Sequence, residues 1–391
     1  MKSVSNVLLQ QGALAKRRSL VKYNSNLRHR AELWLRKFAV RLLCLVPFNI
    51  IRKRIACGRK PIFDDTCEII NIIENDPVIE DCGVGGYANH GRLPKSGHVF
   101  FTKLMYHVRL VGPSLVPIDE SGYLAEEAVN FCRLNDLTIT TLETRILKNT
   151  EPVRIHKKCI SLCANWTHWK NYFHWLIDVV PRLRAYTDDY HILVNDPLAS
   201  YEKQTLEMLG LLDKCIFITG DHVVVDEFKF ISPHASLSTY DPDSLDYLRA
   251  TFLKKIVTPQ KALPKKFYLT REGGRRSPIN ERDLAHKFRD IGWEIIECSD
   301  YSLNDQISLF NNATHIAGCH GAALVNLLWI KPECRVFEIF PVDRILPTAE
   351  MLALHIGASH YSLITNSLTG APIDVDWIVK VVKANEHLEA S

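Results

Sequence analysis

Short hydrophobic runs alternate with amphipathic segments over much of the 391-residue chain. The runs with the length of buried strands lie at 191–194, 215–218, 266–270, 293–296, 315–317 and 335–340. The segments with helical spacing lie at 171–182, 201–211, 280–291, 303–310 and 322–328. Strands that alternate with helices build βαβ units around a parallel sheet, so the pattern predicts an α/β fold.

The domain organisation follows from length and from breaks in this pattern. Residues 61–98 combine short apolar runs with five glycines, which predicts strands and turns. Residues 257–264 contain two prolines and little periodicity, as is typical of a linker. A chain of this length exceeds one hydrophobic core. We therefore expect two Rossmann-like domains, 61–258 and 259–391, facing across a cleft, and an N-terminal arm, 1–60.

The arm is strongly basic. Residues 1–60 hold fifteen Lys or Arg and one acidic residue, a net +14, which leaves −10 of the overall +4 for residues 61–391. The mildly acidic body has no broad basic face for nucleic acid. Apolar residues between the basic ones at 33–48 predict an amphipathic helix on an anionic membrane surface. A solvated or RNA-contacting tail is the alternative, and a spanning helix is excluded by length and charge.

Cysteine usage indicates the compartment. The eleven cysteines are odd in number and spread through apolar segments. This predicts reduced core thiols in a cytoplasmic protein. Peripheral association with the inner face of the membrane is the hypothesis that the basic arm adds.

Residues 171–182 place an imidazole and a carboxylate four positions apart in an aromatic, apolar segment. On a helix, His174 and Asp178 lie on one face. Partial desolvation and the charge of a neighbour are the conditions that tune a general base. His174 is favoured as the proton acceptor because imidazole titrates near neutral pH. The reversed roles, and a purely structural His–Asp contact, are the alternatives.

Arginines and glycines gather where the strand at 266–270 ends. Arg271 and Arg275 offer paired donors to phosphate oxygens, and Gly273 and Gly274 let the backbone approach a ligand. The segment predicts a phosphate contact. A solvated basic loop is the alternative.

A second anion-binding motif follows the strand at 315–317. Gly318 and Gly321 bound a tight turn that carries His320, and Ala322 begins a helix with small residues. Free backbone N–H groups at a helix start bind anions, which predicts a diphosphate site here. The alternative is that the glycines serve only the turn and His320 caps the helix.

Two acidic motifs are candidates for the donor site. Glu338, near the end of a hydrophobic strand, is a candidate acceptor for ribose hydroxyls, or else an acid on an edge strand. Asp374 and Asp376 form a D-x-D pattern that in sugar-nucleotide enzymes holds a divalent ion. Because a helical segment follows directly, an N-cap is the favoured interpretation of Asp374.

The sequence does not contain the usual patterns of a zinc site or an NAD site. His156, Cys159, Cys163 and His168 match no common zinc spacing. The G-x-G-x-x-G pattern of an NAD site is missing after any predicted strand. The sequence therefore predicts neither a zinc site nor an NAD-linked enzyme.

In this order and spacing, the motifs at 171–182, 270–271 and 318–324 resemble glycosyltransferase family 61, a group associated with capsular polysaccharide biosynthesis. The resemblance covers roughly residues 160–340. It implies a GT-B type fold and metal-independent, inverting transfer of a sugar from a nucleoside-diphosphate sugar to an acceptor hydroxyl. The product would be a cell-surface polysaccharide or glycoconjugate.

The resemblance also implies roles for residues. The donor, expected to be UDP-linked, is a substrate, and no cofactor is expected. The base is His174 or Asp178, and Asn171, Trp175 and Arg182 are expected on the acceptor side. The donor side comprises Arg271, Arg275, Gly318, His320, Gly321, Ala322 and Glu338. A non-catalytic scaffold that binds nucleotide sugar or polysaccharide is the alternative function.

Overall fold

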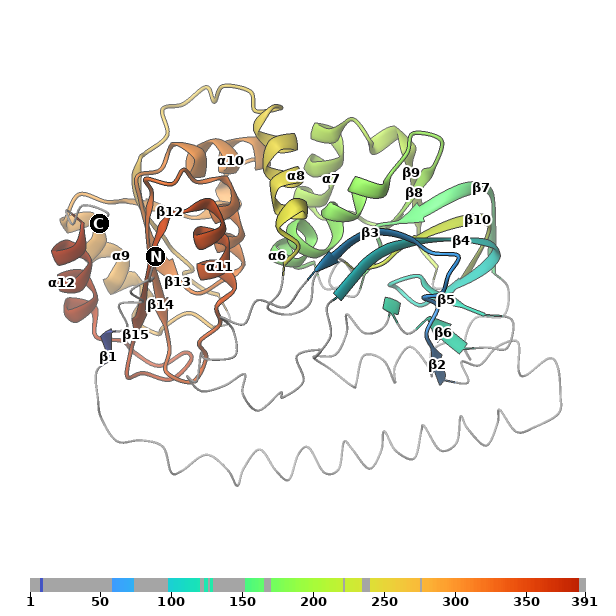
Figure 1. Ribbon diagram of the computed structural model, residues 1–391. Helices are drawn as coiled ribbons and strands as arrows, with labels where there is room; N and C mark the ends of the chain where they lie inside the picture. The colour runs from blue at the N-terminus through green and yellow to red at the C-terminus, as the bar shows by residue number, and fades with distance from the viewer. Residues whose placement is uncertain are drawn as a thin grey trace. The chain divides into compact units, whose positions relative to one another are not determined.

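The computed structural model divides into two compact units, each with its own sheet and helices (Figure 1). Among the described residues, the first unit comprises 58–73 and those between 98 and 241, and the second comprises 8–9 and those between 242 and 386. The predicted α/β class is confirmed. The residues that the structure describes are 8–9, 58–73, 98–119, 123–125, 127–128, 152–164, 170–220, 222–233, 240–274 and 276–386.

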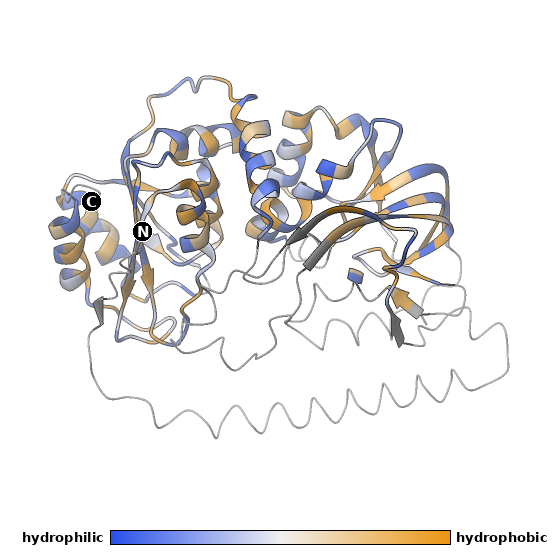
Figure 2. Cartoon of the chain, viewed as in Figure 1, coloured by the Kyte–Doolittle hydropathy of each residue, from blue (hydrophilic) through white to orange (hydrophobic). Residues whose placement is uncertain are grey.

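The second unit contains a parallel sheet between two layers of helices. In spatial order its strands are β12 (Glu294–Ile296), β11 (Lys266–Leu269), β13 (His315–Cys319), β14 (Arg335–Phe340), β15 (Ser359–Ile364) and β1 (Leu8–Leu9). Helices α9 (Glu281–Asp290) and α12 (Val375–Asn385) cover one face, and α10 (Leu303–Asn312) and α11 (Thr348–Ile356) cover the other (Figure 1). Coverage on both faces explains why the central strands β11, β13 and β14 are largely apolar (Figure 2).

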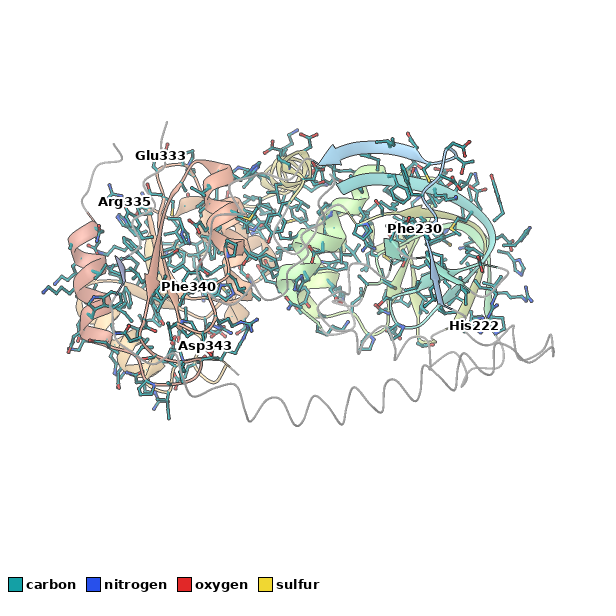
Figure 3. All side chains as sticks on the ribbon, turned by 60° about the horizontal axis from the view of Figure 1, so that its bottom comes forward. His222, Phe230, Glu333, Arg335, Phe340 and Asp343 are labelled. Carbon is teal, nitrogen blue, oxygen red and sulfur yellow. The ribbon has the colours of Figure 1, made fainter. Side chains whose placement is uncertain are left out.

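The order of the strands creates a switch point in this sheet. From β11 the chain passes through α9 to β12 on one side, and it then returns through α10 to β13 on the other side of β11. Ligands of open α/β sheets bind outside the carboxyl ends of the strands at such a point. Figure 3 labels Arg335 at the amino end of β14. Phe340 at the carboxyl end of β14 and Asp343 beyond it mark the edge where ligands bind.

The strands predicted in this unit are confirmed, and one helix differs in type. The segment expected to be an α-helix at 322–328 is a 3-10 helix, η7 (Ala322–Trp329). Leu324 and every residue after it in η7 are buried. Helix η7 packs against α10, α11 and α8 (Pro242–Leu253). Packing on several sides, rather than the local helix propensity, therefore governs its geometry.

The first unit contains a mixed sheet. Strands β7 (Val153–Ser161), β8 (His191–Asn195), β9 (Cys215–Ile218) and β10 (His222–Ile231) are mutually parallel, as predicted. The long strand β4 (His98–Val111) pairs antiparallel with β10, so the sheet is not parallel throughout. The remaining strands are β3 (Glu68–Ile73), β5 (Val116–Ile118), β6 (Tyr123–Ala125) and β2 (Gly58–Lys60).

The helical segment after β7 is irregular. It begins as α6 (Tyr172–His174), continues as one turn of π-helix, η3 (Trp175–Val179), and ends as a 3-10 helix, η4 (Val180–Ala185). Pro181 has no N–H to donate, so the α-helical ladder cannot continue through it. Single π turns inside helices occur frequently at functional sites. Helix α7 (Ser200–Leu209) follows β8.

Most of the basic arm lies outside the described residues. Within the described ranges, no helix is both long enough and apolar enough to cross a membrane.

Candidate active site

A hollow of about 420 Å³ lies at the carboxyl edge of the sheet in the second unit. Its basic side chains are His320 after β13, Arg276 in the loop after β11 and Arg344 in the loop after β14. None of the described residues that line it is acidic. Its basic lining favours an anionic ligand. The other lining residues are Pro278, Cys319, Ile339, Phe340, Pro341, Leu368, Thr369, Gly370, Ala371 and Ile373.

The turn after β13 is built around an arginine from the neighbouring strand. Nη1 of Arg271 donates a hydrogen bond to the carbonyl oxygen of His320. A Cβ atom at Gly321 would lie 2.8 Å from the guanidinium carbon of Arg271, so only glycine leaves room for this side chain. Gly318 is needed for a different reason: a Cβ there would meet Leu269 at 3.0 Å, where β13 and β11 run side by side.

A buried carboxylate supports the loop that carries Arg271. Oε1 of Glu281 accepts hydrogen bonds from the backbone N–H of Arg271 at 3.0 Å and from the hydroxyl of Tyr268 at 2.7 Å. Glu281 lies in the first turn of α9, where the helix dipole favours negative charge. The switch point thus has an internal brace that the sequence motifs did not reveal.

A second buried carboxylate holds His320. Glu338 is completely buried on β14, and its Oε1 lies 2.6 Å from Nδ1 of His320. Its Oε2 lies 2.9 Å from Nε2 of His360 on β15. Burial alone would raise the pKa of Glu338, but hydrogen bonds from both histidines outweigh it and hold the pKa below its ordinary value. The predicted ribose acceptor is therefore engaged with two imidazoles.

The structure unites part of the predicted donor set and adds to it. His320, Gly321 and Arg271 meet at one turn, and Ala322 begins η7 beside them. Arg275 lies outside the described residues. Sequence reasoning missed Arg344, although its position just after the carboxyl end of a parallel strand was a usable signal. Arg276 was visible in the same motif as Arg271 but was not selected.

The loops around Arg344 are tied together. Oδ1 of Asp343 accepts hydrogen bonds from the backbone N–H of Thr369 at 2.7 Å and from its hydroxyl at 3.0 Å. This links the loop after β14 to the loop after β15, and both line the hollow. In the described part of the chain, the Arg344 side chain forms no ion pair.

In the first unit, His174 and Asp178 are in contact as predicted. Nδ1 of His174 forms a short hydrogen bond with Oδ2 of Asp178. The His174 side chain is 19% exposed and that of Asp178 is 6% exposed. Nε2 is therefore the ring nitrogen turned away from the carboxylate. Asn171 caps α6, and its side chain accepts a hydrogen bond from the backbone N–H of His174.

The other two acceptor-side candidates occupy different environments. Trp175 is buried, and its indole N–H donates to Thr205 of α7 at 3.0 Å. The indole satisfies its N–H inside the unit, and the acceptor role of Trp175 stays a prediction. Arg182 is also buried, but it lines a hollow of about 450 Å³ with Ser161, Cys163, Phe230 and other residues of the first unit.

The remaining motifs have structural partners. Asp374 caps α12 by accepting a hydrogen bond from the Trp377 N–H at 3.0 Å, which confirms the N-cap interpretation. The seven described cysteines are all free thiols. Across the described ranges, no group of three or more His, Cys, Asp or Glu side chains is placed to hold a metal ion.

Comparison with known proteins identifies the family of this arrangement. No curated protein matches the chain. The profile of the family described as glycosyltransferase 61 matches residues 172–337, a span that begins at α6 and ends within β14. It includes the His174–Asp178 pair, Arg271 and the His320–Gly321 turn. The match confirms the resemblance seen in the sequence and supports the assignment of residues 172–337 to the glycosyltransferase 61 family.

Proposed function

We propose that this member of a glycosyltransferase family transfers a sugar from a UDP-linked donor to an acceptor hydroxyl, with inversion at the anomeric carbon. One observation carries the proposal: the hollow at the carboxyl edge of the second unit, with Arg276, Arg344 and His320 around it. These side chains suit a diphosphate in charge and in hydrogen-bond donors. A polysaccharide or glycoconjugate is the proposed acceptor, and a peripheral position at the inner membrane face is the proposed location.

The chemistry requires one displacement. The acceptor oxygen attacks the anomeric carbon, a base takes the hydroxyl proton, and the bond from that carbon to the diphosphate oxygen breaks with its electron pair leaving on the diphosphate. Positive side chains that stabilise the departing oxygen lower the barrier. Because arginines can do this without a metal ion, we propose that transfer does not need one.

His174 is the proposed base, and Asp178 orients it. Nδ1 faces the carboxylate, so Nε2 is the nitrogen proposed to take the proton of an acceptor hydroxyl. Inversion needs this base on the opposite side of the sugar from the diphosphate. We therefore propose a GT-B arrangement, in which the two units face each other across a cleft when substrates are bound.

Donor class can be tested by thermal unfolding with UDP, GDP, ADP and uridine. A ligand at a hundred times its Kd stabilises a protein by about 2.7 kcal/mol, which raises its Tm. We expect UDP to raise the Tm and uridine to raise it much less, because uridine lacks the phosphates. If none of the three diphosphates raises the Tm, the donor assignment is wrong.

Catalysis can be tested by replacing His174 with alanine and Asp178 with asparagine. Loss of a general base costs roughly 10² to 10⁴ in rate, so sugar transfer should fall at least about a hundredfold in each variant, while UDP binding is retained. EDTA should leave wild-type transfer unchanged.

The matched control is an exposed His–Asp pair in the same unit. Nδ1 of His156 lies 3.0 Å from Oδ2 of Asp226. The substitutions His156→Ala and Asp226→Asn should leave transfer unchanged. Wild-type transfer rates in both His174→Ala and Asp178→Asn would contradict the assigned base, and a wild-type protein that binds UDP without any transfer would favour the scaffold alternative.

A further inference from the structure

Three side chains form a continuous hydrogen-bonded row behind the hollow of the second unit. His320 lies after β13, Glu338 on β14 and His360 on β15, so three adjacent parallel strands each supply one member. Only His320 lines the hollow. Glu338 is 0% exposed and the side chain of His360 is 1% exposed. The row therefore leads from the buried interior of the sheet to the hollow at its carboxyl edge.

The donor and acceptor chemistry assigns the protons in this row. An ionised carboxylate only accepts hydrogen bonds, so both nitrogens that face it must carry hydrogen. Nδ1 of His320 and Nε2 of His360 are therefore N–H donors. Nδ1 of His360 is buried and, within the described residues, has no hydrogen-bond partner. An unsatisfied buried N–H and an extra charge would both be costly, so His360 is neutral with its single proton on Nε2.

The second nitrogen of His320 is the one left for a ligand. Among the described residues, Nε2 of His320 forms no hydrogen bond, and the ring is stacked on Phe340 with a centroid distance of 5.3 Å. A histidine that donates through Nδ1 to a carboxylate and through Nε2 to an anion carries both protons and one positive charge. Glu338 is the nearest counter-charge that makes this form tolerable in a largely buried position.

We infer that Glu338 and His360 are positioning residues for the donor site: they fix the ring and the Nδ1 proton of His320, so that Nε2–H is presented to a phosphoryl oxygen in the hollow. This differs from the ribose-binding role expected for Glu338 from the sequence. The phosphoryl ligand rests on the proposed function, whereas the proton arrangement does not. The other charged groups around His320 are Arg271, which binds its carbonyl oxygen, and Arg276 and Arg344 of the hollow.

The direction in which anion affinity changes when Glu338 is replaced distinguishes a positioning role from simple charge repulsion. A carboxylate that merely lies near an anion site repels the anion, so its removal should strengthen anion binding. If Glu338 instead holds His320 in its donating form, the change Glu338→Gln should weaken binding. Hydrogen bonds to charged groups are worth enough that a loss of about tenfold or more in affinity for UDP is expected.

The first experiment uses the wild-type full chain labelled with ¹⁵N at histidine. Ring nitrogen shifts distinguish the two neutral tautomers and the doubly protonated form, and a His320→Gln and a His360→Gln sample assign the signals. We expect His320 to carry a proton on Nδ1 and His360 to carry its proton on Nε2, before any ligand is added. A neutral His320 with its proton on Nε2 would overturn the inference.

The second experiment measures UDP binding by calorimetry with uridine as the phosphate-free comparison. We expect Glu338→Gln to weaken UDP binding about tenfold or more without changing the affinity for uridine. His360→Gln keeps an N–H donor for Glu338 and should stay within about threefold of wild type. Asp246→Asn, which removes the exposed partner of His355, is the matched control and should not alter binding or the His320 signal.

The outcomes distinguish the positioning role of Glu338 from the proposed use of a UDP-linked donor. Equal or tighter UDP binding by a folded Glu338→Gln protein would overturn the positioning role. If that variant does not fold, the histidine signals of the wild type still decide. If the wild type shows the expected tautomers but binds no UDP, the donor assignment of the proposed function fails while the proton arrangement remains.

Discussion

At the scale of single residues, the second unit depends on acids that are buried and fully hydrogen-bonded. Glu281 holds the backbone of Arg271, and Glu338 holds the ring of His320. An ionised carboxylate is costly to bury unless several donors surround it, and breaking such a group is strongly destabilising. Both acids act on a basic residue of the candidate donor site rather than on solvent.

Burial also controls the pKa of the cysteine thiols, and this predicts their reactivity. Desolvation raises the pKa of Cys298 and of Cys334 to about 12. Since the thiolate is the reactive species, both should react very slowly with a thiol reagent at pH 8, and the rate should increase about tenfold per pH unit. Alkylation mapped by mass spectrometry tests this. The half-buried Cys67 should be alkylated before Cys298 and Cys334. Unfolding in urea should make the three alkylation rates similar. Rapid labelling of Cys298 in the folded protein would contradict the expectation.

At the scale of elements, two glycines allow close packing at the switch point. Gly318 lets β13 run against Leu269 of β11, and Gly321 leaves room for the guanidinium of Arg271. The backbone of Gly321 is extended, with φ −175°, so any residue could adopt it. Its requirement is therefore for space beside a functional side chain rather than for an unusual backbone.

This makes Gly321→Ala informative. The new methyl group would displace the far end of a flexible side chain, so we expect little loss of stability. Arg271 would lose its hydrogen bond to His320, and UDP binding should weaken by about tenfold. Calorimetry and thermal unfolding measure the two effects. Gly220→Ala, where a Cβ meets nothing within 4 Å, is the control and should change neither. Wild-type affinity in Gly321→Ala would show that the Arg271 position does not matter for the ligand.

The cap of α12 gives a second element-scale prediction. Loss of an N-cap aspartate costs about 1 kcal/mol, so Asp374→Ala should lower the free energy of unfolding by that amount. Asp376→Ala removes only a solvent-exposed partner of Lys287 and should change stability little. Urea denaturation compares the two variants. If both variants instead kept their stability and lost transfer, the metal-binding interpretation of this D-x-D pattern would be correct and the cap a minor role.

At the scale of the whole molecule, charge is distributed very unevenly. Residues 1–60 carry a net +14 while the rest of the chain is acidic. Each basic residue near an anionic bilayer contributes about 1 kcal/mol to binding. The proposed peripheral location rests on this composition alone, and it can be tested on the full chain.

Replacement of Arg52, Lys53 and Arg54 by glutamine should lower binding to phosphatidylserine vesicles by roughly two orders of magnitude, from about 3 kcal/mol of lost attraction. Vesicle sedimentation at low and high salt measures it, since salt screens the attraction. The control replaces Lys254, Lys255 and Lys261, which are exposed in the second unit, and should bind as the wild type does. Equal loss in the control would indicate a general charge effect instead of a basic anchor.

The sequence by itself determined the α/β class, most strands of the second unit, the His174–Asp178 contact, the Asp374 cap and the resemblance to glycosyltransferase family 61. These features depend on local periodicity, on side chains within one turn of each other, or on short motifs whose residue types are demanded by their chemistry. The π turn at Trp175–Val179 and the 3-10 geometry of Ala322–Trp329 were not predictable, since proline placement and packing overrode the simple helical pattern.

Only the tertiary structure decided which distant residues meet. Glu338 and His360 lie 22 positions apart, and Arg271 and His320 lie 49 apart. Their contacts depend on strand order and register, because a slip of one residue would turn each strand side chain to the opposite face. The same register, rather than any motif, brings Arg344 and the loop at 368–371 to the hollow. Local patterns specify the elements, whereas the partners of a buried charge are specified by long-range packing.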